Sequence, residues 1–163
     1  MLTQHFESPD GLFTLEYPRV WDMEEHENIP AFFDPISGNG AMQVLAVDTS
    51  FFNHDALKKE KCINTYPYLN GSTLKDKMII FLHIQQIQFN KDDLKVYTRD
   101  NLIYIPYEYY IQGRFFIAVL MESQNVILLA VYNSAAQPNQ TEAAIIGDIL
   151  KSIQIKNRRN ENG

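Results

Sequence analysis

Alternating apolar and polar side chains mark a β-hairpin near the start of the chain. Residues 8–11 hold a proline, an aspartate and a glycine, which favour a tight turn. After this turn, Phe13, Leu15 and Tyr17 alternate with their neighbours at a period of two, and Pro18 ends the strand. We therefore expect two antiparallel strands around the turn.

Two further strands are expected before residue 50. They are residues 31–34 and residues 42–48, and apolar side chains on both faces of the second one place it inside a sheet. Trp21 is expected to plug one end of the sheet. Residues 22–28 carry four carboxylates around His26, so we interpret them as an acidic surface loop or a short helical turn.

Helical features follow in the middle of the chain. Asn53 is placed to cap a helix that starts at His54 and is stopped by Pro67. Residues 78–89 are ambiguous between helix and strand. A preceding Thr-x-x-Asp resembles a capping pair and favours a helix, whereas 84–89 fits a strand better. We expect a helix that gives way to a strand near residue 84.

The second half of the sequence is dominated by strand patterns. Short strands are expected at 94–98 and 102–105, and a long strand at 107–121 is expected to bend at Gly113 through a bulge. Residues 126–133 are almost wholly apolar, as are strands covered on both faces.

A last helix opens at residues 138–142. Its apolar side chains form one arc at helical spacing, so the helix must lie on the sheet. A short edge strand at 153–155 follows it. The order strands, helix, strands, helix predicts an α+β sandwich, in which an antiparallel sheet carries helices on one face.

Length and charge restrict the classes of function. With 163 residues, the chain is expected to form a single α+β domain over 1–156, followed by a polar tail at 157–163. A net charge of −6 argues against a nucleic-acid partner, and one cysteine excludes a disulfide framework. No secretory signal and no apolar run long enough to cross a bilayer are visible, so we expect a cytoplasmic protein without membrane insertion.

Features near both ends of the sequence resemble a known fold. The first is the pattern FxxxYPxxW from Phe13 to Trp21, and the second is a hairpin ending in Tyr132-Asn133 before an amphipathic helix with the sequence ILKSI. Together they resemble the PsbP-like fold of the extrinsic photosystem protein, the Ran-binding Mog-type proteins and small bacterial families of unknown function. The resemblance fits least over 67–107. It implies an αβα sandwich and a non-enzymatic adaptor or binding role, and it transfers no catalytic residue.

Candidate catalytic and metal-binding side chains have simpler structural interpretations. Cys62 lies too far along a helix from His54 for direct hydrogen bonding, so we interpret it as a small buried residue. Asp22 and His26 could coordinate a metal ion together only if their segment is helical. Phosphate-cradling and nucleophile-elbow motifs are absent. We therefore predict no catalytic residue, no metal site and no cofactor.

Tyrosines gather around residues 104–116 and provide the candidate binding site. Tyrosine and arginine are common anchors of protein interfaces. The predicted partner-binding residues are Tyr107, Tyr109, Tyr110, Gln112 and Arg114. Ordinary packing of the sheet is the competing interpretation.

Two functions follow from these observations. The first is a non-enzymatic protein-binding or adaptor domain that buries this aromatic, arginine-containing strand in a protein partner. The alternative is a small-molecule-binding domain or enzyme, with a pocket between sheet and helix that uses Gln112, Arg114 and His83.

Overall fold

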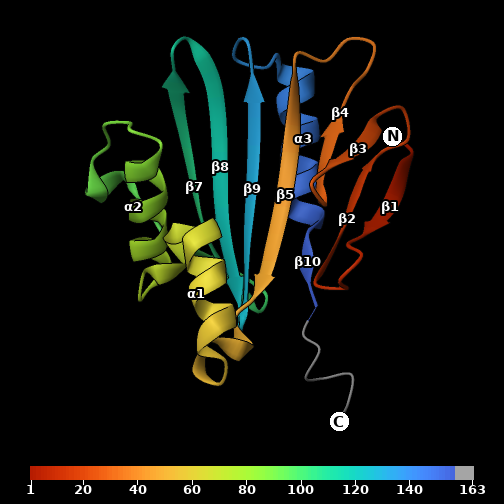
Figure 1. The fold of residues 1–163 in the computed structure, drawn as a ribbon. Coiled ribbons are helices and arrows are strands. Elements are labelled where there is room, and N and C mark those ends of the chain that lie inside the picture. The colour runs from red at the N-terminus through yellow and green to blue at the C-terminus, as the bar shows by residue number, and fades with distance from the viewer. Residues whose placement is uncertain (157–163) are drawn as a thin grey trace.

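The computed structural model describes residues 1–156 and is built around one large antiparallel sheet (Figure 1). The predicted tail at 157–163 lies outside the described residues. Seven strands form the sheet, and each is hydrogen-bonded to the next across it. From one edge to the other they are β3 (Asp22–His26), β4 (Ile29–Phe33), β5 (Gly40–Asp48), β9 (Val126–Ser134), β8 (Arg114–Ser123), β7 (Leu102–Ile111) and β6 (Tyr97–Arg99).

A second sheet contains strands from both ends of the described chain. Its order is β1 (Thr3–Glu7), β2 (Phe13–Pro18) and β10 (Gln154–Ile155), so the predicted hairpin and the predicted last edge strand both form. The last helix, α3 (Gln140–Ser152), packs beside β2. A hydrogen bond between backbone and side chain reinforces this contact, because the N–H of Glu16 donates to Ser152 Oγ at 2.8 Å.

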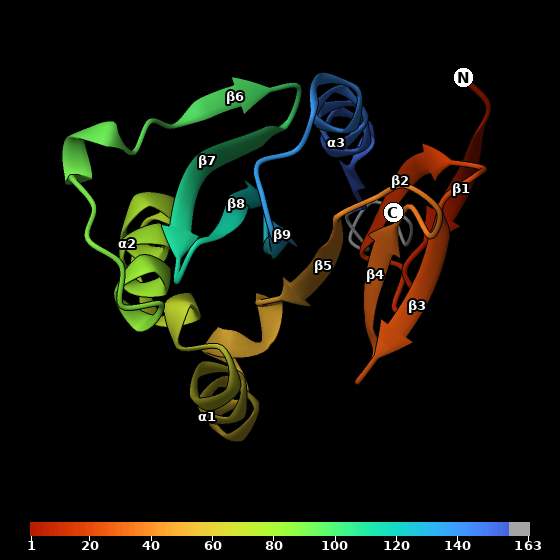
Figure 2. The same cartoon turned by 90° about the horizontal axis from the view of Figure 1, so that it is seen from above.

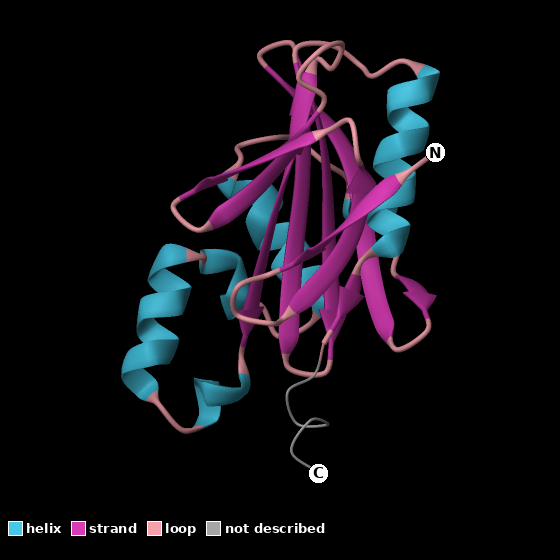
Figure 3. Cartoon of the chain, turned by 90° about the vertical axis from the view of Figure 1, so that its right-hand side faces the viewer, coloured by secondary structure: helices cyan, strands magenta, loops and turns pink. Residues whose placement is uncertain are grey.

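Two apolar cores lie on opposite faces of the large sheet. The first joins the small sheet and α3 to the sheet's back face, and it buries Trp21, as expected. The second joins the front face to α1 (Ala56–Thr65), α2 (Leu74–Ile84) and their short connection η2 (Pro67–Asn70). The helices therefore flank both faces of the large sheet (Figures 2 and 3), and the expectation of helices on one face is wrong. The alternation of apolar and polar residues along the strands does not indicate which face carries helices, because both faces of β8 and β9 are apolar.

The helix starts depend on side-chain caps. Asp55, rather than Asn53, caps α1, because its carboxylate accepts the N–H of Lys58 at 3.1 Å. Residues 50–53 instead form the short 3-10 helix η1 (Ser50–Asn53). Thr73 caps α2 by accepting the N–H of Asp76 at 3.0 Å, which confirms the predicted capping pair.

Two predicted segments differ from the structure. Residues 22–28 are not a loop or a helical turn, because 22–26 pair with β4 as the edge strand β3. Residues 84–89 are not a strand, because α2 ends at Ile84 and a connection containing η3 (Lys91–Asp93) leads to β6. The strand expected at 94–98 is reduced to the three residues of β6.

Candidate binding surface at the edge of the large sheet

The predicted long strand at 107–121 is a hairpin. Ile111 pairs with Arg114, and Gln112 and Gly113 form a two-residue turn with positive φ angles of 50° and 82°. Two positive φ angles in a two-residue loop match the twist of the flanking strands. Gly113 therefore reverses the chain rather than bending it, and the predicted binding residues do not share one face of one strand.

Tyr109 points to the front face and belongs to the core. It is 6% exposed, and its ring lies parallel to that of Phe116 across the strand pair, with centroids 5.1 Å apart. The Tyr109 ring also stacks on the ring of Tyr107, with centroids 6.2 Å apart. Burial raises the pKa of Tyr109 to about 12. Tyr109 therefore holds the sheet together and supports Tyr107.

Tyr110 points to the back face and is 56% exposed. Its ring meets the buried ring of Phe115 edge-on, with a centroid distance of 5.4 Å. This contact fixes the direction of the tyrosine while most of its surface remains accessible. Among the predicted binding residues, Tyr110 therefore has a large aromatic surface that a partner can contact.

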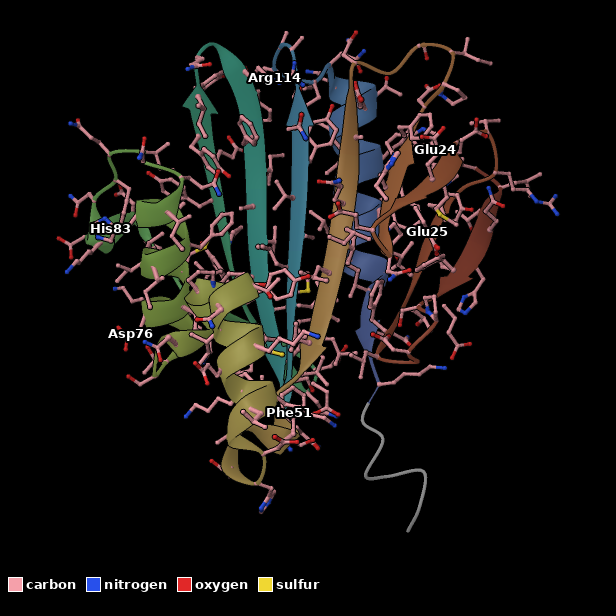
Figure 4. All side chains as sticks on the ribbon, in the orientation of Figure 1. Glu24, Glu25, Phe51, Asp76, His83 and Arg114 are labelled. Atoms are coloured by element: carbon pink, nitrogen blue, oxygen red, sulfur yellow. The ribbon has the colours of Figure 1, made fainter. Side chains whose placement is uncertain are left out.

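Arg114 lies at the far end of the hairpin, at the top of the sheet in Figure 4. Its guanidinium donates a hydrogen bond to Asn133 Oδ1 at 2.8 Å. Because Asn133 is on β9, this bond turns Arg114 across the sheet and away from β7. The structure thus directs the guanidinium of Arg114 away from the four other predicted residues, although Gln112 lies only two positions before it.

A groove of about 400 Å³ brings those four residues together along the outer edge of β7. We call it the edge groove, and its second wall is the connection that follows α2. Its lining consists of Gln86, Ile87, Gln88, Tyr107, Glu108, Tyr109, Tyr110, Ile111 and Gln112.

The second wall of the edge groove is set by the end of α2. Gln86 has a left-handed φ of 59°, and its N–H donates to the carbonyl of His83 at 3.0 Å. The N–H of Ile87 reaches back to the carbonyl of Leu82 at 3.5 Å. This pair of bonds is the Schellman ending of a helix, which usually has glycine where Gln86 stands. Because the usual signal is missing, 86–88 could not be identified as part of the site from the sequence.

A second hollow of about 400 Å³ lies between the large sheet and the α1–α2 region. We call it the lower cavity. Within it, Lys77 Nζ lies 4.0 Å from a carboxylate oxygen of Glu122, with side chains only 12% and 29% exposed. Its lining consists of Thr49, Phe52, Asn53, Lys59, Ile63, Leu69, Asn70, Gly71, Ser72, Lys77, Glu122, Gln124 and Ile127.

Comparison with known proteins identifies the fold. No protein family and no curated protein matches the sequence. The solution structure of cyanobacterial PsbP (CyanoP) from Synechocystis sp. PCC 6803 matches with a TM-score of 0.57 and 12% identity, covering 94% of this chain and 92% of CyanoP. The fold is PsbP-like.

A crystal structure from Bacteroides thetaiotaomicron VPI-5482 is also similar to this chain. The match has a TM-score of 0.54 and 14% identity, and it covers 97% of this chain but 50% of the other one. The chain therefore spans half the length of that protein. These likenesses confirm the predicted resemblance, and at such identities they concern the fold alone.

In this PsbP-like fold, the pocket expected from Gln112, Arg114 and His83 does not form. His83 lies on the outer side of α2, well separated from Arg114 in Figure 4. The ring of His83 instead contacts the ring of Phe89, with centroids 5.2 Å apart. The space between sheet and helices is the lower cavity, which has a different lining.

The acidic segment at residues 22–28 does not form the metal site considered for Asp22 and His26. In a strand, Asp22 and His26 are four residues apart along an extended backbone, too far to share a metal ion. The His26 ring lies 3.4 Å from the carboxylate of Glu24 instead. Within residues 1–156, no three histidine, cysteine or carboxylate side chains gather as a metal site, and none of the helices has the length and apolar character to cross a bilayer.

Proposed function

We propose that this chain is a protein-binding domain without chemistry of its own, and that its docking surface is the edge groove with Tyr110 at the rim. The exposed position of Tyr110 beside a groove lined by Tyr107 and Tyr109 carries this proposal. Tyrosine combines a large apolar ring with a polar tip at little conformational cost, so it anchors many protein interfaces.

The tyrosines of the groove have different roles in this proposal. Tyr110 and Tyr107 contact the partner, whereas Tyr109 keeps the groove in shape from within the core. Gln112 forms the end of the groove at the hairpin turn. Arg114, held by Asn133, contributes to the polar rim of a larger interface rather than to the groove.

A capture experiment with matched variants tests this function. The full chain is used as bait in a lysate of its source organism, beside Tyr110→Ala and Arg114→Ala. Tyr97→Ala is the control, because Tyr97 is 46% exposed and stacks on Tyr104 but does not line the groove. We expect the wild type and the Tyr97→Ala control to capture the same protein. Tyr110→Ala should fail to capture it, and Arg114→Ala should capture a reduced amount.

The capture result is then measured with the purified partner by calorimetry. We expect the Tyr110→Ala variant to bind at least 10-fold more weakly, while its melting temperature stays within about 2 °C of the wild type. Equal binding by the Tyr110→Ala variant would remove the edge groove from the interface.

A small-molecule site is the second candidate, and the half-buried Lys77–Glu122 pair in the lower cavity favours it. Two opposite charges in a polar hollow suit a small ligand that carries both charges, such as an amino acid. Melting curves with a panel of such compounds test this function. A rise in melting temperature that disappears in Lys77→Met supports it, and unchanged curves across the panel count against it.

We also propose that the partner meets this domain in the cytoplasm. The fold requires no oxidising compartment, because Cys62 is the one cysteine of the chain and has no second cysteine to pair with. Fractionation of cells that produce the full-length protein tests the location, and recovery outside the cytoplasm would contradict it.

A further inference from the structure

The edge groove runs beside a stretch of β7 that has a neighbouring strand on one side only. On its inner side, β7 pairs with β8 from Ile103 to Ile111. On its outer side, β6 pairs with Leu102, Ile103 and Tyr104 and then ends. Figure 1 shows the upper part of β7 as the margin of the large sheet.

Two hairpin turns determine which backbone groups point outward. Ile111 and Arg114 flank a two-residue turn, so they exchange hydrogen bonds, and Tyr109 and Tyr107 face β8 in the same way. Arg99 and Leu102 flank the two-residue turn between β6 and β7, so Leu102 and Tyr104 face β6. Both turns give the same result: the backbone N–H and carbonyl groups of the even-numbered residues of β7 point outward, away from β8.

The outward groups beyond the end of β6 belong to three residues. Glu108 and Tyr110 each present an N–H and a carbonyl, and Pro106 presents a carbonyl alone. No backbone hydrogen bond from other described residues reaches these groups. Pro106 fits this orientation, because a proline in a sheet must have its missing N–H on a side without a partner strand.

We propose that the edge groove binds an extended segment of a partner protein, which adds to the large sheet as a strand beside β7. This rests on the proposed function and names the form of the partner. Backbone groups of Pro106, Glu108 and Tyr110 would pair with the segment and supply affinity that is independent of its sequence.

Side chains of the groove specify the composition of that segment. The Tyr107, Tyr109 and Ile111 side chains lie on the groove's front side with Ile87, so they favour apolar side chains at alternate positions of the segment. Glu108 is exposed and forms no ion pair within the described residues. A lysine or arginine opposite Glu108 would complete a cross-strand pair of opposite charge.

The opposite margin of the sheet is unsuited to the same role. Its edge strand β3 exposes Asp22, Glu24 and Glu25 along a backbone already paired with β4 (Figure 4). Rows of charged side chains on an edge strand discourage the addition of another strand. With a net charge of −6, a second copy of the chain would also meet overall electrostatic repulsion.

Glu108→Pro separates strand addition from ordinary side-chain contact. It removes an outward N–H and leaves the bonds between β7 and β8 in place, as Pro106 already does two residues earlier. Glu108→Gln is the matched control, because it removes the charge and keeps the N–H. Tyr110→Ala tests the groove itself, so the proposed function and the strand addition can fail separately.

The probes are synthetic peptides selected from a random 12-residue display library on the full-length wild-type chain. We expect Glu108→Pro to bind them at least 10-fold more weakly and Glu108→Gln to bind only a few-fold more weakly. We also expect the amide hydrogens of Glu108 and Tyr110 to exchange rapidly in the free chain and slowly with peptide bound.

Three results would overturn the inference. Normal peptide binding by Glu108→Pro, combined with loss in Tyr110→Ala, would keep the groove as the site but exclude an added strand. If both amides exchange slowly in a free chain that sediments as a dimer, a second copy of the chain is the occupant of the groove. If they exchange slowly in a monomer, the outer edge of β7 is already covered within the chain. A library that yields no peptide competing at the groove would exclude an extended peptide as the ligand.

Discussion

Six residues other than glycine adopt positive φ angles within residues 1–156, and five of them stand in two-residue hairpin turns. They are Glu27, Asn28, Asp100, Gln112 and Gln124. Only asparagine and aspartate among them belong to the residue types that tolerate this conformation well. Glutamate and glutamine are strained there, so these turns depend on the strands that they connect.

Gln112 is the position where this strain can be measured most simply. Asn-Gly is the preferred sequence for such a turn, so Gln112→Asn should raise the free energy of unfolding by a few tenths to about 1 kcal/mol. Gln112→Val should lower it by about 1–2 kcal/mol, because a β-branched residue fits a positive φ poorly. Urea unfolding measures both, and a stabilising Val substitution would contradict the turn geometry.

Tyr68 illustrates the cost of a buried hydroxyl. Its hydroxyl oxygen is buried and has no hydrogen-bond partner among the described residues, and burial raises the pKa of the phenol. We expect Tyr68→Phe to stabilise the protein by about 1 kcal/mol, because it removes an unsatisfied polar group.

Tyr132→Phe is the matched comparison for Tyr68. The Tyr132 hydroxyl donates to Glu142 Oε1 at 2.9 Å, and both residues are buried. Its removal leaves the Glu142 carboxylate without that bond, so thermal unfolding should show a loss of about 1–3 kcal/mol. Equal effects of the two substitutions would contradict the difference in bonding.

At the scale of elements, Arg99 connects β6 to the end of α3. Its guanidinium donates to the carbonyls of Ile153 at 3.0 Å and Leu150 at 3.4 Å. The last carbonyls of a helix lack partners within the helix, and a cation there is favourable. Arg99 therefore holds the C-terminal end of α3 against the large sheet.

We expect Arg99→Ala to lower the free energy of unfolding by about 1–2 kcal/mol, since charged hydrogen bonds to two carbonyls are lost. Arg99→Lys should give a smaller loss, because lysine cannot bond both carbonyls in the same geometry. Urea unfolding followed by circular dichroism measures both effects. Arg19→Ala, an exposed arginine, should change stability by less than about 0.5 kcal/mol, and a similar loss there would show that the Arg99 contacts are unimportant.

The elements themselves were predictable wherever side-chain periodicity had one interpretation. The hairpin of β1 and β2, the central strand β5 and the amphipathic helix α3 are confirmed. The long strand at 107–121 was wrong because Phe115–Met121 continues an apolar pattern across the turn at Gly113. The edge strand β3 was missed because its charged side chains are typical of loops.

The candidate site was less predictable than the fold. The tyrosine cluster on β7 is visible in the sequence, and four of the five predicted residues line the edge groove. The way the predicted residues are distributed over the two faces of the large sheet depends on the hairpin turn at Gln112. The other wall, 86–88, comes from a helix ending without its usual glycine, and only tertiary packing brings it to β7.

At the scale of the whole molecule, buried tyrosines make stability depend on alkaline pH. Burial raises the pKa of Tyr109 and Tyr132 to about 12, and it raises those of Tyr68 and Tyr17 above their ordinary value of 10. Unfolding lets these groups lose protons from pH 10 upward, so the stability present below pH 10 is lost as the pH rises towards 12.

We expect the free energy of unfolding to be unaffected by these groups up to about pH 9. By pH 11 it should fall by about 1 kcal/mol for each of Tyr109 and Tyr132. Urea unfolding at pH 8, 10 and 11 measures the loss, and absorbance at 295 nm should show late-titrating tyrosines in the folded chain. A constant free energy up to pH 11 would contradict the burial of these phenols.

The bond from Glu16 to Ser152 joins residues that are 136 positions apart. A ribosome adds roughly 5–20 residues per second, so roughly 7 to 27 s separate the synthesis of these two residues. During this time β2 has neither α3 nor β10 beside it, and apolar Phe13 and Leu15 lack part of their final cover. A nascent chain of this fold therefore presents an apolar hairpin to chaperones until its last helix leaves the ribosome.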